Sequence, residues 1–166
     1  MNIAEVLNQW PEVTKLLAVA GTPYCWGAGD LRNVQLVKPS VPSSFPKGSK
    51  GGHGFDCSGL AQWALWITGQ VKADAWTDLS AHDLAYACDG VEDPDNARPG
   101  DLYFYKNAGA ERIHHVTVAL GGGLCLHASG GSANNGDDPA KSVQVVHYRR
   151  GGNFLTCGRL KAQYNP

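Results

Sequence analysis

The stretch HHVTVALGGGLCLHA, residues 114–128, contains two apolar runs joined by three consecutive glycines. The consecutive β-branched residues of the first run, Val116 to Val118, are typical of a β-strand, and glycine tolerates the positive φ angles that tight turns require. The stretch therefore predicts a β-hairpin. A hairpin centred on Gly122 has three facing pairs: Leu120 with Leu124, Val118 with Leu126, and Thr117 with His127.

The register of this hairpin decides which histidine meets His127. When the hairpin is centred on Gly122, His115 and His127 are diagonal neighbours on one face. Their backbone positions are then about 7–8 Å apart across the two strands, and one imidazole can hydrogen-bond to the other. A two-residue turn would shift the pairing by one residue and make His114 the partner instead, because a one-residue slip moves every side chain to the opposite face. Spacing alone leaves both registers open.

Strand patterns continue beyond the hairpin, and helical patterns precede it. Helices are predicted at 13–20, at 57–68 behind the N-cap residue Asp56, and at 80–90. Strands are predicted at 102–105, 113–120, 124–128, 143–148 and 154–160. Helices followed by strands indicate an α+β fold, in which N-terminal helices pack on a C-terminal antiparallel sheet of about five strands.

The length and composition of the chain bound its organisation and its partners. Its 166 residues, with no internal repeat or linker, are expected to form one domain, 1–166. A segment at about 30–54, rich in Pro, Ser, Gly and Lys, is interpreted as an inserted functional or mobile loop. The net charge of −1 favours neither nucleic acid nor an anionic membrane as a partner.

The cysteines and the termini bear on the compartment of the protein. Five cysteines without CxxC spacing argue against a secreted disulfide scaffold. No run approaches the ~20 apolar residues that span a bilayer, and the N-terminus lacks the pattern of a secretory signal peptide. We therefore expect a protein that is made in the cytoplasm.

A second stretch, GGHGFDCSGL at residues 51–60, places Cys57 where a glycine-rich loop becomes a helix. The free N–H groups and the positive dipole end of a helix N-terminus lower the pKa of a thiol, as does a nearby imidazolium. The same N–H groups can hydrogen-bond an oxyanion on an attacked carbonyl. Cys57 is thus a candidate nucleophile that needs a histidine as its base, although a cysteine at a helix start is, taken alone, more often structural.

Five motifs occur in order along the chain: GTPYCWG (21–27), FDCSGL (55–60), RPGDLYFY (98–105), HVTVALG (115–121) and LHA (126–128). From about Val13 to Arg159 the sequence resembles the NlpC family of bacterial and phage cell-wall cysteine peptidases, a circularly permuted branch of the papain-like fold. This resemblance implies that Cys57 is the nucleophile, His115 its base and His127 the residue that orients the base. It also favours the register that is centred on Gly122.

The resemblance further implies a peptidoglycan hydrolase. Relatives cleave the stem peptide through a thioester intermediate, most often between γ-D-glutamate and a diamino acid, without a cofactor or metal. Tyr24, Asp56 and Ser58 resemble residues that line the cleft and bind the stem peptide. Two features depart from the family: the long 30–54 segment, and TDLSAHD at 77–83 in place of a frequent arginine-serine segment.

Several alternatives stay open beside the endopeptidase. The same triad would serve an amidase or an acyltransferase, and Cys57, His115 and His127 are also residue types that suit zinc. A non-catalytic wall-docking or virion module would keep the fold alone. As a hydrolase, the protein is expected to act as a monomer on the cell wall, after delivery by a phage tail or a secretion assembly or after lysis, as a bacteriolytic phage lysin does.

Overall fold

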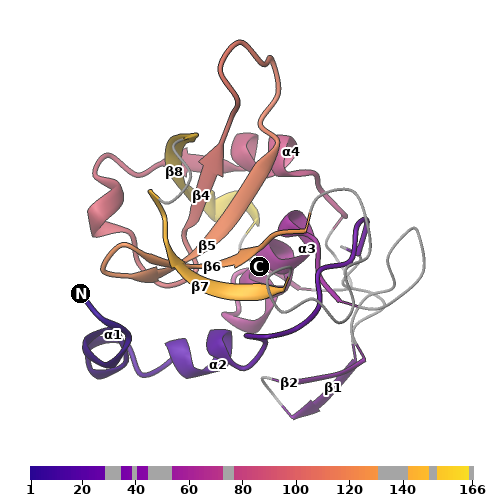
Figure 1. The fold of residues 1–166 in the computed structure, drawn as a ribbon, viewed down its shortest axis with the longest axis vertical. Coiled ribbons are helices and arrows are strands. Elements are labelled where there is room, and N and C mark those ends of the chain that lie inside the picture. The colour runs from indigo at the N-terminus through magenta and orange to yellow at the C-terminus, as the bar shows by residue number, and fades with distance from the viewer. Residues whose placement is uncertain are drawn as a thin grey trace.

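The computed structural model describes residues 1–28, 35–38, 41–44, 54–72, 77–130, 142–149 and 153–164. Its helices are α1 (Ile3–Gln9), α2 (Val13–Leu17), α3 (Cys57–Ile67), α4 (Ala81–Tyr86), and the 3₁₀ turns η2 (Pro94–Asn96) and η3 (Ala162–Tyr164). Its strands are β1 (Gln35–Lys38), β2 (Val41–Ser44), β3 (Cys88–Gly90), β4 (Leu102–Tyr105), β5 (His115–Gly121), β6 (Leu124–Ala128), β7 (Val143–His147) and β8 (Phe154–Leu160). Figure 1 shows their arrangement.

An antiparallel sheet of six strands, in the order β3-β8-β4-β5-β6-β7, forms the centre of the fold. Helix α3 packs against β5 and β6. Helices α1 and α2 lie next to the edge strand β7, and Gly21, which follows α2, donates a backbone hydrogen bond to the carbonyl of Val143 (Figure 1). The α+β expectation is confirmed, with β3 as a sixth strand that was not predicted.

The segment at 30–54 was expected to be a loop. Part of it, β1 and β2, forms a two-stranded antiparallel sheet apart from the main one. The rest of this expectation lies outside the described residues.

The three predicted helices exist, with different ends, and one helix was missed. Helix α3 begins at Cys57 as predicted, because the carboxylate of Asp56 accepts a hydrogen bond from the N–H of Gly59, at 2.7 Å. Helix α4 ends at Tyr86 and not at Gly90, since Cys88 enters the sheet opposite β8. Helix α2 is shorter than predicted.

The missed helix, α1, has a readable start signal. Asn2 and Glu5 form a capping box in which each side chain accepts a hydrogen bond from the backbone N–H of the other.

Helix α3 is the centre of the main hydrophobic core. Its consecutive residues from Gly59 to Leu65 are all buried, so the helix is enclosed on most sides. Burying each large apolar side chain, such as that of Leu60 or Leu65, contributes about 1.5–3 kcal/mol. This burial makes the start of α3, where Cys57 lies, a rigid position.

The hairpin β5–β6 combines features of the two registers that the sequence left open. Its turn has two residues, Gly122 and Gly123, whose φ angles of 58° and 79° are those of a type I′ turn. A register shift between Ala119 and Gly121 places an extra residue, Leu120, in β5. The extra residue offsets the one-residue shift of the two-residue turn, so the strand pairing beyond the bulge is that of the register centred on Gly122.

Two predicted pairs of the hairpin are tested by this register. Val118 pairs with Leu126, as predicted. Leu124 pairs with Gly121, so the predicted pair of Leu124 with Leu120 is wrong. The predicted face of His115 is kept because the bulge lies between it and the turn.

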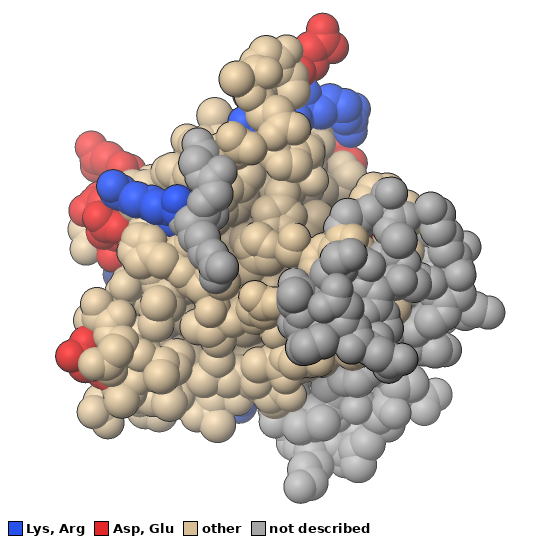
Figure 2. Space-filling view, viewed as in Figure 1, with Lys and Arg blue, Asp and Glu red and all other residues tan. Residues whose placement is uncertain are grey.

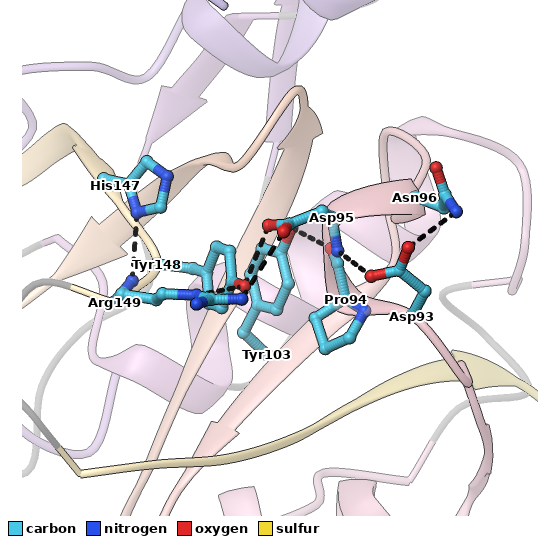
Figure 3. A network of polar contacts seen from close by, with 8 residues as sticks. All are labelled: Asp93, Pro94, Asp95, Asn96, Tyr103, His147, Tyr148 and Arg149. Atoms are coloured by element: carbon cyan, nitrogen blue, oxygen red, sulfur yellow. Dashed lines mark hydrogen bonds and ion pairs between the residues drawn. The ribbon is translucent and has the colours of Figure 1, made fainter.

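A second, smaller core covers the opposite face of the sheet. It holds the buried side chains of Ala97, Tyr103, Tyr105, Ala119, Cys125, Tyr148 and Cys157. The rings of Tyr103 and Tyr148 stack with centroids 4.5 Å apart. Their hydroxyls donate hydrogen bonds to the Pro94 carbonyl and to the Asp95 carboxylate, at 3.1 and 2.9 Å (Figure 3).

This network anchors the end of β7. Arg149 donates a hydrogen bond to the Tyr148 hydroxyl and forms an ion pair with Asp95, at 3.4 Å (Figure 3). The backbone carbonyl of Tyr148 in turn accepts a hydrogen bond from the hydroxyl of Tyr105, at 2.7 Å. The second core thereby fixes the position of the Tyr105 side chain.

Charged side chains are sparse on the face that Figure 2 shows. Lys, Arg, Asp and Glu lie mainly at its periphery, and the centre of the described surface is uncharged (Figure 2). Within the described ranges, none of the helices has the length and apolar character needed to cross a membrane.

Candidate active site

A cleft of about 460 Å³ brings together four of the six predicted site residues. Cys57 comes from the start of α3, His115 from β5, His127 from β6 and Tyr24 from the segment after α2. We call this cleft the first hollow; its lining is Tyr24, Trp26, Cys57, Tyr105, His114, His115, His127, Ser129, Gly130 and Asn153.

The two strand histidines lie in ring contact. The centroids of His115 and His127 are 4.7 Å apart, with the ring planes tilted by 52°. The predicted proximity of this pair is therefore confirmed. His114, the alternative partner, is exposed at the cleft edge, with its ring centroid 6.3 Å from that of His115.

The environment of His115 keeps its imidazole neutral. Burial, followed by the charges of His127 and His114, lowers its pKa to about 3. Its Nε2 is buried, and no residue in the described part of the chain forms a hydrogen bond with that atom. The ring of Tyr105, held by the second core, packs against His115 with centroids 5.4 Å apart.

The thiol of Cys57 does not have the lowered pKa that its helix position predicts. Burial and the neighbouring carboxylate of Asp56 raise the pKa to about 12. The backbone groups of Val116, Ser58 and Cys57 itself act in the opposite direction but are outweighed. The residue that caps α3 thus places a negative charge beside the thiol and offsets the helix field.

The thiol and the imidazole are consequently both neutral near pH 7 in the free protein. Both shifts disfavour an ion pair of thiolate and imidazolium as the resting state. A nucleophilic role for Cys57 then requires that its proton pass to His115 as the sulfur attacks.

Tyr24 and Asp56 hold the two sides of the cleft in place. A parallel bridge pairs Tyr24 with Phe55, which brings the YCWG segment beside the start of α3. The carboxylate of Asp56 accepts hydrogen bonds from the N–H of Gly27, at 3.0 Å, and from the hydroxyl of Ser58, at 3.2 Å, besides capping α3. Burial, and then the charge of Cys57, raises the pKa of the Tyr24 hydroxyl, which therefore stays protonated.

A second hollow, of about 440 Å³, adjoins the first one at the thiol. Its lining is Trp26, Gly27, Asp56, Cys57, Ser58, Asp78, Leu79, Ser80, Ala81, His82, Arg112, Ile113 and His114. Asp56 and Ser58, the remaining predicted site residues, line this hollow and not the first. Trp26, which is 47% exposed, and His114 line both hollows together with Cys57.

The wall of the second hollow depends on a buried residue that sequence reasoning missed. Gln62, fully buried within α3, donates to the Asp78 carboxylate, at 2.8 Å, and accepts a hydrogen bond from the N–H of Leu79, at 2.9 Å. It thereby joins the segment before α4 to α3. A polar residue inside an otherwise apolar helical run was the signal that could have identified it.

Trp26 and Tyr105 were also not predicted as site residues. Both occur inside motifs that the sequence analysis quotes, but nothing in their local pattern separates a cleft position from a core position. For the zinc alternative, no group of three or more His, Cys, Asp or Glu side chains within the described ranges is placed to hold a metal ion.

Comparison with known proteins identifies a family and several relatives. Residues 21–150 match the model of the NlpC/P60 family. The chain is 32% identical to the peptidoglycan endopeptidase RipB of Mycobacterium tuberculosis over 128 residues, 77% of this chain and 46% of RipB. It is 33% identical to the peptidoglycan endopeptidase RipA of the same organism over 109 residues, 65% of this chain and 19% of RipA. The chain thus spans less than half the length of these relatives.

Solved structures show the same fold. The P60 domain of antigen MAP1204 from M. avium subspecies paratuberculosis has 26% identity and a TM-score of 0.54, over 95% of each chain. RipD of M. tuberculosis, described as a non-catalytic NlpC/P60 domain protein adapted to peptidoglycan binding, has 23% identity and a TM-score of 0.55, over 97% of this chain and 98% of its own. The papain-like expectation is confirmed, and the chain belongs to the NlpC/P60 family.

Proposed function

We propose that this protein is a peptidoglycan hydrolase, a cysteine endopeptidase that cleaves an amide bond of the stem peptide. The observation that carries the proposal is the cleft in which Cys57, His115 and His127 meet, with the two imidazoles 4.7 Å apart. The names of RipB and RipA, both peptidoglycan endopeptidases, support the substrate class.

The proposed first step follows from the neutral resting state. The sulfur of Cys57 attacks the amide carbonyl while its proton moves to His115, and the backbone N–H of Cys57 hydrogen-bonds the oxyanion that forms. His127 positions the imidazole of His115 for this proton transfer.

The second half of the reaction returns the protein to its starting state. The imidazolium of His115 gives its proton to the leaving amine, which leaves a thioester on Cys57. His115 then takes a proton from water, and the resulting attack releases the carboxylic acid and the free thiol. We propose the bond between γ-D-glutamate and the diamino acid as the one cleaved, with Tyr24, Asp56 and Ser58 contacting the stem.

Mass spectrometry of digested muropeptides tests this proposal. The expected products are two stem fragments that carry a new carboxyl group and a new amine at the proposed bond. A product that has lost the whole stem from the sugar would instead identify an amidase, and a product joined to a new amine would identify an acyltransferase.

A non-catalytic wall-binding protein is the second candidate, and the fold neighbour RipD favours it. The raised pKa of the Cys57 thiol is compatible with that role. Binding of purified peptidoglycan without release of any stem fragment would support this candidate and overturn the endopeptidase.

A further inference from the structure

A third hollow, of about 260 Å³, lies beside the second one. Its lining is His82, Ala85, Tyr86, Lys106, Glu111, Ile113 and Leu155. His82 and Ile113 line the second hollow as well, so the second and third hollows meet at these two residues. The two hollows are therefore neighbours, separated by the contact between His82 of α4 and Ile113.

The junction between these hollows presents a fixed hydrogen-bond donor. The N–H of Ile113 donates to Nδ1 of His82, at 3.3 Å. An imidazole that accepts through Nδ1 carries its proton on Nε2. The His82 ring is thus oriented by the backbone, with an Nε2–H group available for an acceptor on a bound molecule.

The third hollow also contains an exposed aromatic ring. Tyr86 is 70% exposed, and its ring meets that of His82 edge-on, with centroids 5.1 Å apart. Its backbone carbonyl accepts a hydrogen bond from the Lys161 ammonium group, at 2.7 Å. Leu155, 46% exposed, adds apolar surface, while Lys106 and Glu111 supply charged polar groups.

We propose that the third hollow is a sugar subsite, which binds the amino sugar that carries the stem peptide. This inference rests on the proposed function. A pyranose ring presents apolar C–H groups that suit the face of Tyr86, and hydroxyl and acetamido groups that suit His82, Lys106 and Glu111. Few residues separate the sugar from the proposed scissile bond, so a stem that runs from Cys57 through the second hollow would place its sugar near the third. The substrate is then a stem still attached to its glycan.

Two substrates with the same stem peptide test the sugar subsite. One is the free stem, and the other carries the disaccharide. The wild-type protein is expected to have the higher kcat/KM on the disaccharide-linked stem. Tyr86→Ala should reduce that preference about three- to tenfold, mainly through KM, because the stacking surface is removed.

A matched variant controls for the loss of an exposed tyrosine. Tyr164 is 40% exposed and lines none of the three hollows, so Tyr164→Ala should keep the wild-type preference. Equal kcat/KM values of the wild type for the two stems, or an unchanged preference in Tyr86→Ala, would overturn the inference and leave the endopeptidase intact. A preference for a cross-linked stem without sugar that Tyr86→Ala abolishes would assign the hollow to a second peptide and also overturn it.

Direct binding separates this inference from the proposed function. If the wild type cleaves neither stem, the endopeptidase fails, and the disaccharide without a stem becomes the probe. Its binding, followed by chemical-shift changes in the NMR spectrum and weakened by Tyr86→Ala, would support the sugar subsite. No binding at millimolar disaccharide would refute it.

Discussion

The two sides of the cleft reach their geometry by different routes. Cys57 is positioned by its own neighbours, because Asp56 caps the helix that begins at the thiol. His115 and His127 are positioned by strand pairing, in which a short glycine turn and a bulge at Leu120 offset each other. The helix side depends on local hydrogen bonds, whereas the strand side depends on register, so a small change at the turn should affect residues several positions away.

The thiol itself should show the largest effect. Cys57→Ala should lower the rate of stem cleavage by about three or more orders of magnitude, because no other group can form the thioester. Cys88→Ala, which removes a buried thiol that lines neither the first nor the second hollow, is the matched control and should keep activity. Cleavage of peptidoglycan by Cys57→Ala at the wild-type rate would refute the mechanism.

Gly121 tests the strand side. A Cβ there would lie 2.3 Å from the ring of Trp10, and its φ of +96° strains any other residue. Gly121→Ala should reduce the free energy of unfolding by about 2–5 kcal/mol, measured by urea denaturation, and reduce activity as the hairpin shifts.

A substitution at Gly109 distinguishes the cost of backbone strain from the cost of a steric clash. It also has a positive φ, +75°, but a Cβ there meets nothing within 4 Å. Gly109→Ala should therefore cost only the backbone strain, about 1–3 kcal/mol, and keep activity. Equal losses of stability in the two variants would show that contact with Trp10 does not hold the turn.

The buried imidazole should make stability depend on pH. The pKa of His115 is lowered from its ordinary value to about 3 in the folded protein, so the unfolded chain binds more protons between those two pH values. Stability should therefore fall as the pH drops from 7 to 4. Urea unfolding of His115→Gln should show a smaller decrease, by on the order of 1–3 kcal/mol. Parallel pH profiles of the two proteins would mean that His115 titrates normally.

The smallest effect should come from the charge beside the thiol. Asp56→Asn removes the charge that raises the pKa of Cys57 but keeps a good helix cap. Alkylation by iodoacetamide at pH 8 should accelerate a few-fold, since more thiolate is present. Asp56→Ala separates the cap from the charge because it should also lose about 1 kcal/mol of stability. No acceleration in Asp56→Asn would leave burial as the sole cause of the raised pKa.

The local sequence predicted much of the fold but not all element ends. The cap at Asp56 and the apolar run after it were sufficient for α3, and the strands next to the glycine turn were found from their alternating apolar pattern and the glycines between them. The end of α4 was wrong because Cys88 pairs with β8, some seventy residues later in the chain. Helical spacing cannot reveal such a partner.

The candidate site was likewise predicted only in part from the sequence. Pattern and family resemblance together identified Cys57, His115 and His127, and the structure brings them into one cleft. Sequence reasoning missed Trp26 and Gln62, which line or support the second hollow. Trp26 has no local pattern that distinguishes its role, whereas the polar Gln62 stands out in an apolar helical run.

By itself the sequence determined the helix start, the strand order around the hairpin and the residue types available for chemistry, because these depend on hydrogen bonds and periodicities within a few residues. Only the tertiary structure decided the protonation of the cleft. The pKa of Cys57 rises and that of His115 falls because both groups are partly buried where α3 packs on β5, and the desolvation of a charge depends on everything packed around it.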